Sequence, residues 1–150
     1  MKIARFVAAG FGSGYAPVAA GTAGSAAAVL AGAVLLWLSP LLLAAAALAA
    51  TFGGYLAVER AHVEGDPGWV VIDEFAGQWI ALLALAAPSV PGIAAAFILF
   101  RFFDITKLGP VGWADRKHGP FGIMADDVIA GVIAAALLLI VRLFRPGWIM

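Results

Sequence analysis

Carboxylates stand beside apolar stretches at three places in this sequence, where such side chains are costly unless they have a function. Asp73 and Glu74 come directly before one apolar stretch, and Asp126 and Asp127 precede another. One carboxylate is enough to cap a helix, whereas two adjacent ones repel each other unless a cation joins them. The chain has no cysteine and two histidines. Oxygen ligands of this kind favour Mg²⁺ or Mn²⁺ over Zn²⁺.

The third place combines a carboxylate with two cations. Arg101, Asp104 and Lys107 follow one another at i, i+3 and i+6 near the end of an apolar stretch, so they lie close to one helical face. The plain alternative is that Arg101 and Asp104 form an ion pair that neutralises itself. Carboxylates, a divalent metal and nearby Arg and Lys side chains are the combination that phosphoryl transfer requires. The cations neutralise phosphate oxygens while a carboxylate positions or deprotonates water.

Two further features have weaker meaning on their own. Residues 12–25 form a glycine-rich lead into an apolar helix, and backbone N–H groups at such a helix start can hold a phosphate. The run lacks the Gly-Lys-Ser/Thr ending of a nucleotide-binding loop, so close helix packing is the competing interpretation. His118, in a loop rich in Gly and Pro, is either a general acid or base or an ordinary surface residue.

The composition indicates an integral membrane protein. Of the 150 residues, 64% are hydrophobic and 12% charged, where soluble domains have about 25% charged residues. The mean hydropathy is +1.03. Nine basic residues balance nine acidic ones, which argues against a nucleic-acid binder, and the absence of cysteine excludes disulfides and thiol catalysis. We expect one all-α domain over residues 1–150, a polytopic bundle of about four to five apolar helices.

The apolar segments and their breaks predict the elements that position these residues. Helices over about 24–38 and 40–58 form a hairpin, with Ser39 and Pro40 ending the first and starting the second. Residues 73–87 and 92–107 form a shorter hairpin, tilted or partly re-entrant. A last helix runs over about 126–144, so that Asp126 and Asp127 open it.

The charges at the N-terminus favour a cytoplasmic start for this topology. Lys2 and Arg5 lie there, and a cleavable signal peptide is disfavoured because glycines and Pro17 interrupt the following apolar stretch. Five crossings then place the acidic helix ends on the cytoplasmic side. The same count puts Arg142 and Arg145 on the other side, against the positive-inside tendency, unless one short segment does not cross.

Four segments, taken in order, resemble the phosphatidylglycerophosphatase A family: residues 12–25, 66–77, 100–107 and 122–131. Each is weakly specific, but the ordered set covers nearly the whole chain. Two departures are Ala20 in place of a family Pro, and His118-Gly119-Pro120 in place of His-Gly-Gly. The resemblance implies a Mg²⁺-dependent phosphatase of the bacterial inner membrane, with its site facing the cytoplasm. Its substrate would be the membrane lipid phosphatidylglycerophosphate, hydrolysed to phosphatidylglycerol and inorganic phosphate.

The resemblance and the residue chemistry together imply a set of site residues. They imply substrate binding by Thr22, Ser25, Arg101, Lys107 and His118, metal ligation by Asp73, Glu74, Asp126 and Asp127, and catalytic roles for Asp73, Asp104 and Asp127. Three alternatives stay open. They are a broader lipid phosphatase acting on phosphatidic acid, a small ion- or proton-coupled transporter, and a non-catalytic membrane scaffold.

Overall fold

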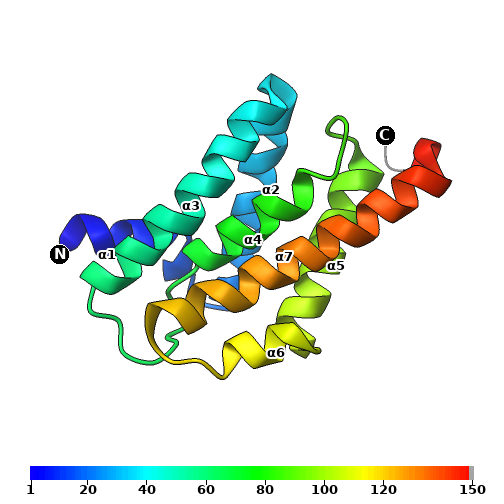
Figure 1. Cartoon of the computed structure of the whole chain (residues 1–150). Coiled ribbons are helices and arrows are strands. Elements are labelled where there is room, and N and C mark those ends of the chain that lie inside the picture. The colour runs from blue at the N-terminus through cyan, green and yellow to red at the C-terminus, as the bar shows by residue number, and fades with distance from the viewer. Residues whose placement is uncertain (149–150) are drawn as a thin grey trace.

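The computed structural model describes residues 1–148, and every regular element in that range is helical, as predicted (Figure 1). In chain order the elements are α1 (Lys2–Ala8), the 3-10 helix η1 (Ser13–Tyr15), α2 (Ala20–Leu38), α3 (Pro40–Arg60), α4 (Ile72–Leu82), α5 (Val90–Thr106), α6 (Pro110–Asp115), α7 (Gly119–Phe144) and the 3-10 helix η2 (Pro146–Trp148).

Three of the described helices, α2, α3 and α7, are long and apolar enough to cross a membrane. The predicted hairpin of α4 and α5 is shorter. The 11 residues of α4 span ~16 Å, about half of a ~30 Å hydrocarbon core, and the 17 residues of α5 span ~25 Å. The expected count of four to five apolar helices is therefore approximate, with three spanning helices and two shorter ones.

The α2–α3 hairpin forms as its sequence predicts. The Ser39 side chain accepts a hydrogen bond from the backbone N–H of Leu41 (3.2 Å), and Pro40 occupies the first turn of α3. A capping hydroxyl followed by proline ends one helix and starts the next within two residues. The hairpin thereby returns the chain to the side on which α2 began.

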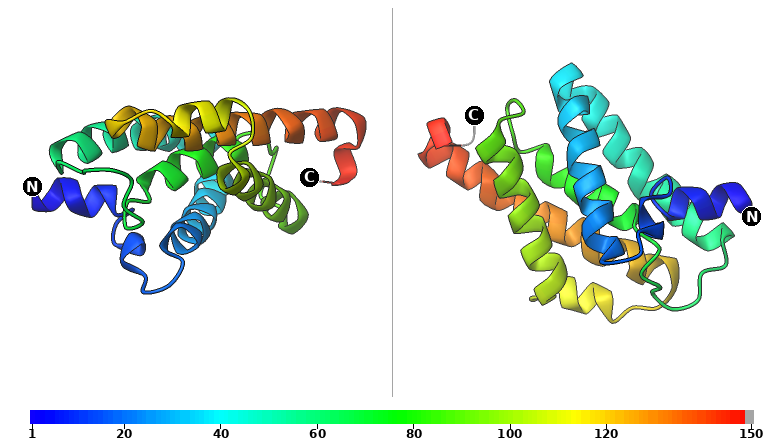
Figure 2. Two further views of the ribbon diagram at one scale, coloured as in Figure 1. Left: turned by 90° about the horizontal axis from the view of Figure 1, so that it is seen from below. Right: turned by 180° about the vertical axis from the view of Figure 1, so that it is seen from behind.

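Helix α4 forms the centre of the bundle. All of its residues except Ile80 are buried. It lies in a middle layer, with α3 and α7 on one side and α2 and α5 on the other (Figure 2). Its closest neighbour is α7: a Cβ added to Gly131 would lie 2.3 Å from the carbonyl oxygen of Gly77. Two glycines thus let the helices touch backbone to backbone.

The start of α7 corrects one prediction. The helix begins at Gly119, not at Asp126 and Asp127, which lie about two turns inside it. Pro120 is the reason, because proline fits the first turn of a helix and nothing between it and Asp126 breaks the helix. Asp126 and Asp127 are therefore buried within the helix instead of capping its end.

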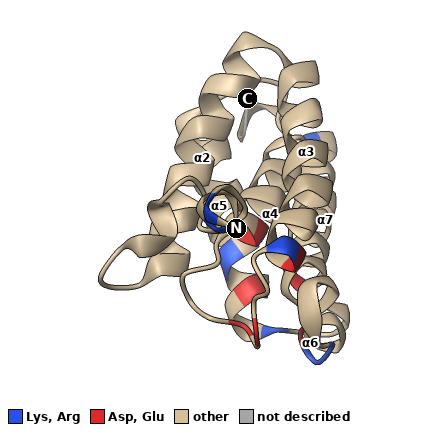
Figure 3. Ribbon diagram, turned by 90° about the vertical axis from the view of Figure 1, so that its left-hand side faces the viewer, with Lys and Arg blue, Asp and Glu red and all other residues tan. Residues whose placement is uncertain are grey.

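The charged residues gather toward one end of the bundle (Figure 3). The start of α2, the start of α4, the end of α5 and the first turns of α7 all contribute to one cavity there. This convergence is the arrangement that the sequence predicted for the acidic helix ends. Arg142 is found elsewhere, where it donates a hydrogen bond to the carbonyl oxygen of Ala84 (3.2 Å) beyond the end of α4.

Candidate active site

The helix ends enclose a polar cavity of about 120 Å³, which we call the site cavity. Its walls carry six carboxylates and one cation: Asp66, Asp73, Glu74, Asp104, Asp126, Asp127 and Lys107. Gly21, at the start of α2, closes one side. All four segments that carried the family resemblance contribute to this region of the structure.

Three of the predicted metal ligands come together in the site cavity. Asp73, Glu74 and Asp127 each offer one oxygen, and these oxygens lie within 4.8 Å of one another. All three side chains are buried, and Glu74 Oε2 has no hydrogen-bond partner. A buried carboxylate oxygen without a partner is unfavourable, and a hard divalent cation would satisfy it. The residues present therefore fit a Mg²⁺ ion.

Asp126, the fourth predicted ligand, is engaged differently. Its Oδ2 accepts a hydrogen bond from Lys107 Nζ at 2.5 Å, and its Oδ1 accepts one from the backbone N–H of Asp127 at 2.9 Å. It lies beside the three-carboxylate group but is not part of it. The structure thus places Asp126 as an anchor for Lys107 next to the three converging carboxylate oxygens.

Asp104 links the two cations of the site. Arg101 donates to Asp104 Oδ2, and Lys107 Nζ lies 3.2 Å from Asp104 Oδ1. The predicted placement of these three side chains on one helical face is confirmed. Because both carboxylate oxygens have a cationic partner, Asp104 fixes the positions of Arg101 and Lys107 relative to each other.

Arg101 also reaches across to α2 and α4. Its guanidinium lies 3.4 Å from Thr22 Oγ1, 3.5 Å from Ser25 Oγ and 3.9 Å from Glu74 Oε1. Thr22 is exposed and can meet a ligand, whereas Ser25 is fully buried behind the guanidinium. Thr22 and Ser25 are thus brought to the site as predicted, in different positions.

The glycines of the N-terminal run serve close packing against the segment that leads into α4. A Cβ at Gly14 would lie 2.0 Å from the backbone oxygen of Trp69, and one at Gly21 would lie 2.7 Å from Glu74 Oε1. At Gly24 it would meet Val71 at 2.6 Å. Of the two interpretations of this run, the structure supports packing, which holds Asp73 and Glu74 in place.

Burial and mutual repulsion shape the charge of the site. Burial, together with the neighbouring charge of Glu74, raises the pKa of Asp73 well above its usual value. Burial raises the pKa of Glu74 to about 8, helped by the charges of Asp127 and Asp104. Burial opposes the charge of Lys107, but Asp126 and Asp104 outweigh it and raise the pKa of Lys107. With no cation bound, burial therefore favours protonated Asp73 and Glu74, and a cation bound there would have to displace these protons.

Two acidic residues of this region are not among those predicted from the sequence. Asp66 lines the site cavity, and Asp115 Oδ1 lies 3.5 Å from Lys107 Nζ. Asp66 lies in the α3–α4 connection and Asp115 ends the short helix α6, both in stretches rich in Gly and Pro, where the sequence suggests a turn. The only available signal was that each connection joins two helices whose ends carry site residues. His118 does not line the site cavity but an adjacent pocket.

Comparison with known proteins gives consistent matches. The family profile described as phosphatidylglycerophosphatase A matches residues 6–142. Phosphatidylglycerophosphatase A of Escherichia coli (strain K12) is 41% identical over 138 residues, which are 89% of this chain and 80% of that protein. The protein of the same name from Haemophilus influenzae is 41% identical over 143 residues, 92% of this chain and 88% of that protein.

A further relative has a different name. A Bacteroides thetaiotaomicron protein, provisionally named as a phosphatidylinositol-3-phosphatase, is 41% identical over 147 residues, covering 89% of each chain. No solved structure matches the chain significantly.

Proposed function

The chain belongs to the phosphatidylglycerophosphatase A family, and from this premise we propose that it hydrolyses the terminal phosphomonoester of phosphatidylglycerophosphate in a Mg²⁺-dependent reaction. It is a phosphatase with apolar helices suited to a membrane. The observation that carries the proposal is the juxtaposition of three buried carboxylates with Lys107 in one cavity, and with Arg101 against the Glu74 and Asp104 side chains of its wall.

Asp73, Glu74 and Asp127 would hold the metal. Their oxygens converge, they are buried, and Glu74 Oε2 has no other partner. Bound Mg²⁺ would neutralise charge on the phosphate oxygens. Oxygen-only coordination suits Mg²⁺ or Mn²⁺, and activity with each metal separates the two.

Arg101, Lys107 and Thr22 would bind the terminal phosphate. Lys107 lines the site cavity, and Arg101 lies against two residues of its wall, Glu74 and Asp104, so two positive groups lie at the same helix end. Charge-assisted hydrogen bonds to phosphate are stronger than neutral ones. The exposed Thr22 hydroxyl, 3.4 Å from the guanidinium, adds a neutral donor on the α2 side.

Asp104 would also orient the attacking water, since it lies between the two phosphate-binding cations. The water oxygen forms a bond to the terminal phosphorus while the bond between phosphorus and the glycerol oxygen breaks. One proton of the water passes to a site carboxylate, and the released glycerol oxygen takes up a proton. The products are phosphatidylglycerol and inorganic phosphate.

The lipid substrate is consistent with the position of the site. The spanning helices α2, α3 and α7 would lie in the bilayer while the site cavity opens near their ends, where a lipid head group is found. Lys2 and Arg5 near the start of the chain support a cytoplasmic location for this end. We place the enzyme in the bacterial inner membrane with its site facing the cytoplasm.

Phosphate release by the detergent-purified protein tests the proposal. Phosphatidylglycerophosphate, phosphatidic acid and phosphatidylinositol 3-phosphate are supplied separately, each with Mg²⁺ and with EDTA. The third lipid is included because one relative is named for it. We expect Mg²⁺-dependent release from phosphatidylglycerophosphate above all. Comparable release from phosphatidic acid would indicate a broader lipid phosphatase. Preferential phosphate release from the inositol lipid would refute the proposed substrate. The absence of release from all three lipids, with the protein shown to be folded, would refute it as well.

A further inference from the structure

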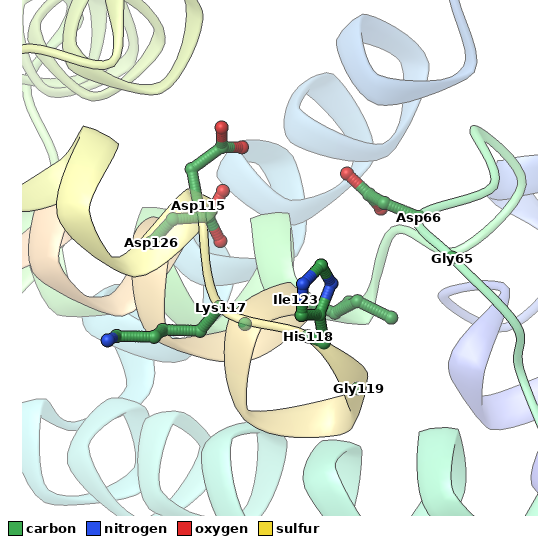
Figure 4. Close-up of a pocket in the computed structure, with 9 residues that line it drawn as sticks. Gly65, Asp66, Asp115, Lys117, His118, Gly119, Ile123 and Asp126 are labelled. Carbon is green, nitrogen blue, oxygen red and sulfur yellow. The ribbon is translucent and has the colours of Figure 1, made fainter.

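A second cavity lies next to the site cavity, and we call it the loop pocket. It encloses about 180 Å³ between the α3–α4 connection, the α6–α7 turn and the first turns of α7 (Figure 4). Asp66 and Asp126 line both the loop pocket and the site cavity. A molecule whose terminal phosphate occupies the site cavity therefore finds this polar volume immediately beside it.

The polar side chains of the loop pocket face one another. Figure 4 shows Asp66 on one side, Asp115 and Asp126 on the other, and the His118 ring below and between them, whereas the Lys117 side chain points away. Lys117 Nζ instead lies 4.8 Å from the centre of the Trp113 ring. Asp66 and His118 are thus the side chains most available to a ligand.

Charge within the loop pocket is partly neutralised. Lys107 Nζ pairs with Asp126 at 2.5 Å and with Asp115 at 3.5 Å. Asp66 has no ion pair among residues 1–148 and is free to accept a hydrogen bond from a hydroxyl. The start of α7 adds a favourable field for an anion, because no acidic residue lies in its first turn and His118 makes no capping hydrogen bond there.

The proposed substrate has a group of matching chemistry. Between its two phosphates, phosphatidylglycerophosphate carries a glycerol with one free hydroxyl, whereas phosphatidic acid joins its phosphate directly to diacylglycerol. Resting on the proposed function, we infer that the loop pocket binds this glycerol and the phosphodiester that follows it. Asp66 accepts a hydrogen bond from the free hydroxyl, and His118 donates a hydrogen bond to the phosphodiester. The pocket thereby selects lipids with a polar spacer over phosphatidic acid.

The variant His118→Ala tests this assignment, with His62→Ala as the matched control, because His62 lines a different cavity together with Glu59. Initial rates are measured on phosphatidylglycerophosphate and phosphatidic acid in mixed micelles. Inhibition constants are measured for phosphatidylglycerol, which needs the loop pocket, and for inorganic phosphate, which needs only the site cavity. Asp66→Asn provides a second variant if His118→Ala does not fold.

We expect His118→Ala to lower kcat/KM on phosphatidylglycerophosphate by about tenfold, as for loss of a hydrogen bond to a charged group. The inhibition constant of phosphatidylglycerol should rise by a similar factor, while that of inorganic phosphate stays unchanged. An unchanged kcat/KM on phosphatidylglycerophosphate would overturn the assignment. So would an equal loss of kcat/KM on both lipids accompanied by a higher inhibition constant for inorganic phosphate. A wild-type protein inactive on phosphatidylglycerophosphate would instead refute the proposed function, so the two failures are distinguishable.

Discussion

Replacing Gly131 by alanine should separate the two helices that carry the proposed metal ligands. The added Cβ would lie 2.3 Å from the carbonyl oxygen of Gly77 and 2.8 Å from its Cα, where ordinary contacts begin near 3.4 Å. These are backbone atoms, so no side chain can turn aside, and α4 and α7 must move apart by about 1 Å. Asp127 lies one turn from Gly131, and Asp73 and Glu74 lie one turn from Gly77.

The expected effect on catalysis is large compared with the effect on folding. A displacement of about 1 Å at reacting groups costs roughly 100-fold in rate, whereas overpacking of this kind costs about 1–3 kcal/mol of stability. We would measure Mg²⁺-dependent phosphate release and thermal unfolding of the variant in detergent. Gly53→Ala is the control, because a Cβ there meets nothing within 4 Å. Wild-type turnover by a correctly folded Gly131→Ala protein would refute the role of this contact.

Three further outcomes follow from the site geometry. Asp127→Asn should abolish Mg²⁺-dependent turnover while the protein stays folded in the membrane, because it removes one of three converging oxygens; full residual activity would remove Asp127 from the site. Arg101→Lys should lower kcat/KM by at least about tenfold, because a lysine cannot reproduce the forked contacts to Thr22, Ser25 and Asp104; an unchanged KM for the lipid would contradict phosphate binding by Arg101. Without divalent metal, the melting temperature should fall as the pH rises from about 4.5 toward 8, because the pKa of Glu74 is raised to about 8 in the folded protein and the unfolded chain loses that proton first. Mg²⁺ should reverse this fall, and Glu74→Gln should make it shallower, leaving the part due to Asp73, as measured by melting curves across the pH range; a flat wild-type profile would show that Glu74 does not hold a proton in the fold.

Local patterns explain why much of the fold could be predicted from the sequence. Apolar runs of membrane length and a Ser-Pro cap depend on neighbouring residues alone, and they gave the α2–α3 hairpin within four residues at either end. The predicted start of α7 is wrong because the Gly- and Pro-rich stretch around Pro120 fits a loop as well as a helix start. Proline is compatible with both a turn and the first turn of a helix, and only the packing of the bundle decides between them.

The site was predictable in its residue types but not in its pairings. The sequence could not show that Lys107 binds Asp126 and thereby separates it from Asp127, because that contact joins residues 19 apart on different helices. Arg142 presents the same difficulty, since its partner Ala84 lies 58 residues away in the chain. Asp66 and Asp115 were missed for a related reason, since a connection of ordinary composition and the short helix α6 bring them to the site only after the longer helices have packed.

The short buried helix α4 has a consequence for the biogenesis of the protein. At 11 residues it cannot cross a bilayer alone, and two carboxylates stand at its start. Its most extensive packing partner is α7, which leaves the ribosome last among the membrane-spanning helices. Before α7 is inserted, α4 lacks the helix surface that covers Gly77. The carboxylates of Asp73 and Glu74 also lack the third carboxylate of their group, that of Asp127. Assembly of the catalytic centre is therefore one of the last steps of membrane insertion, and a nascent chain that stalls before α7 cannot act on lipid.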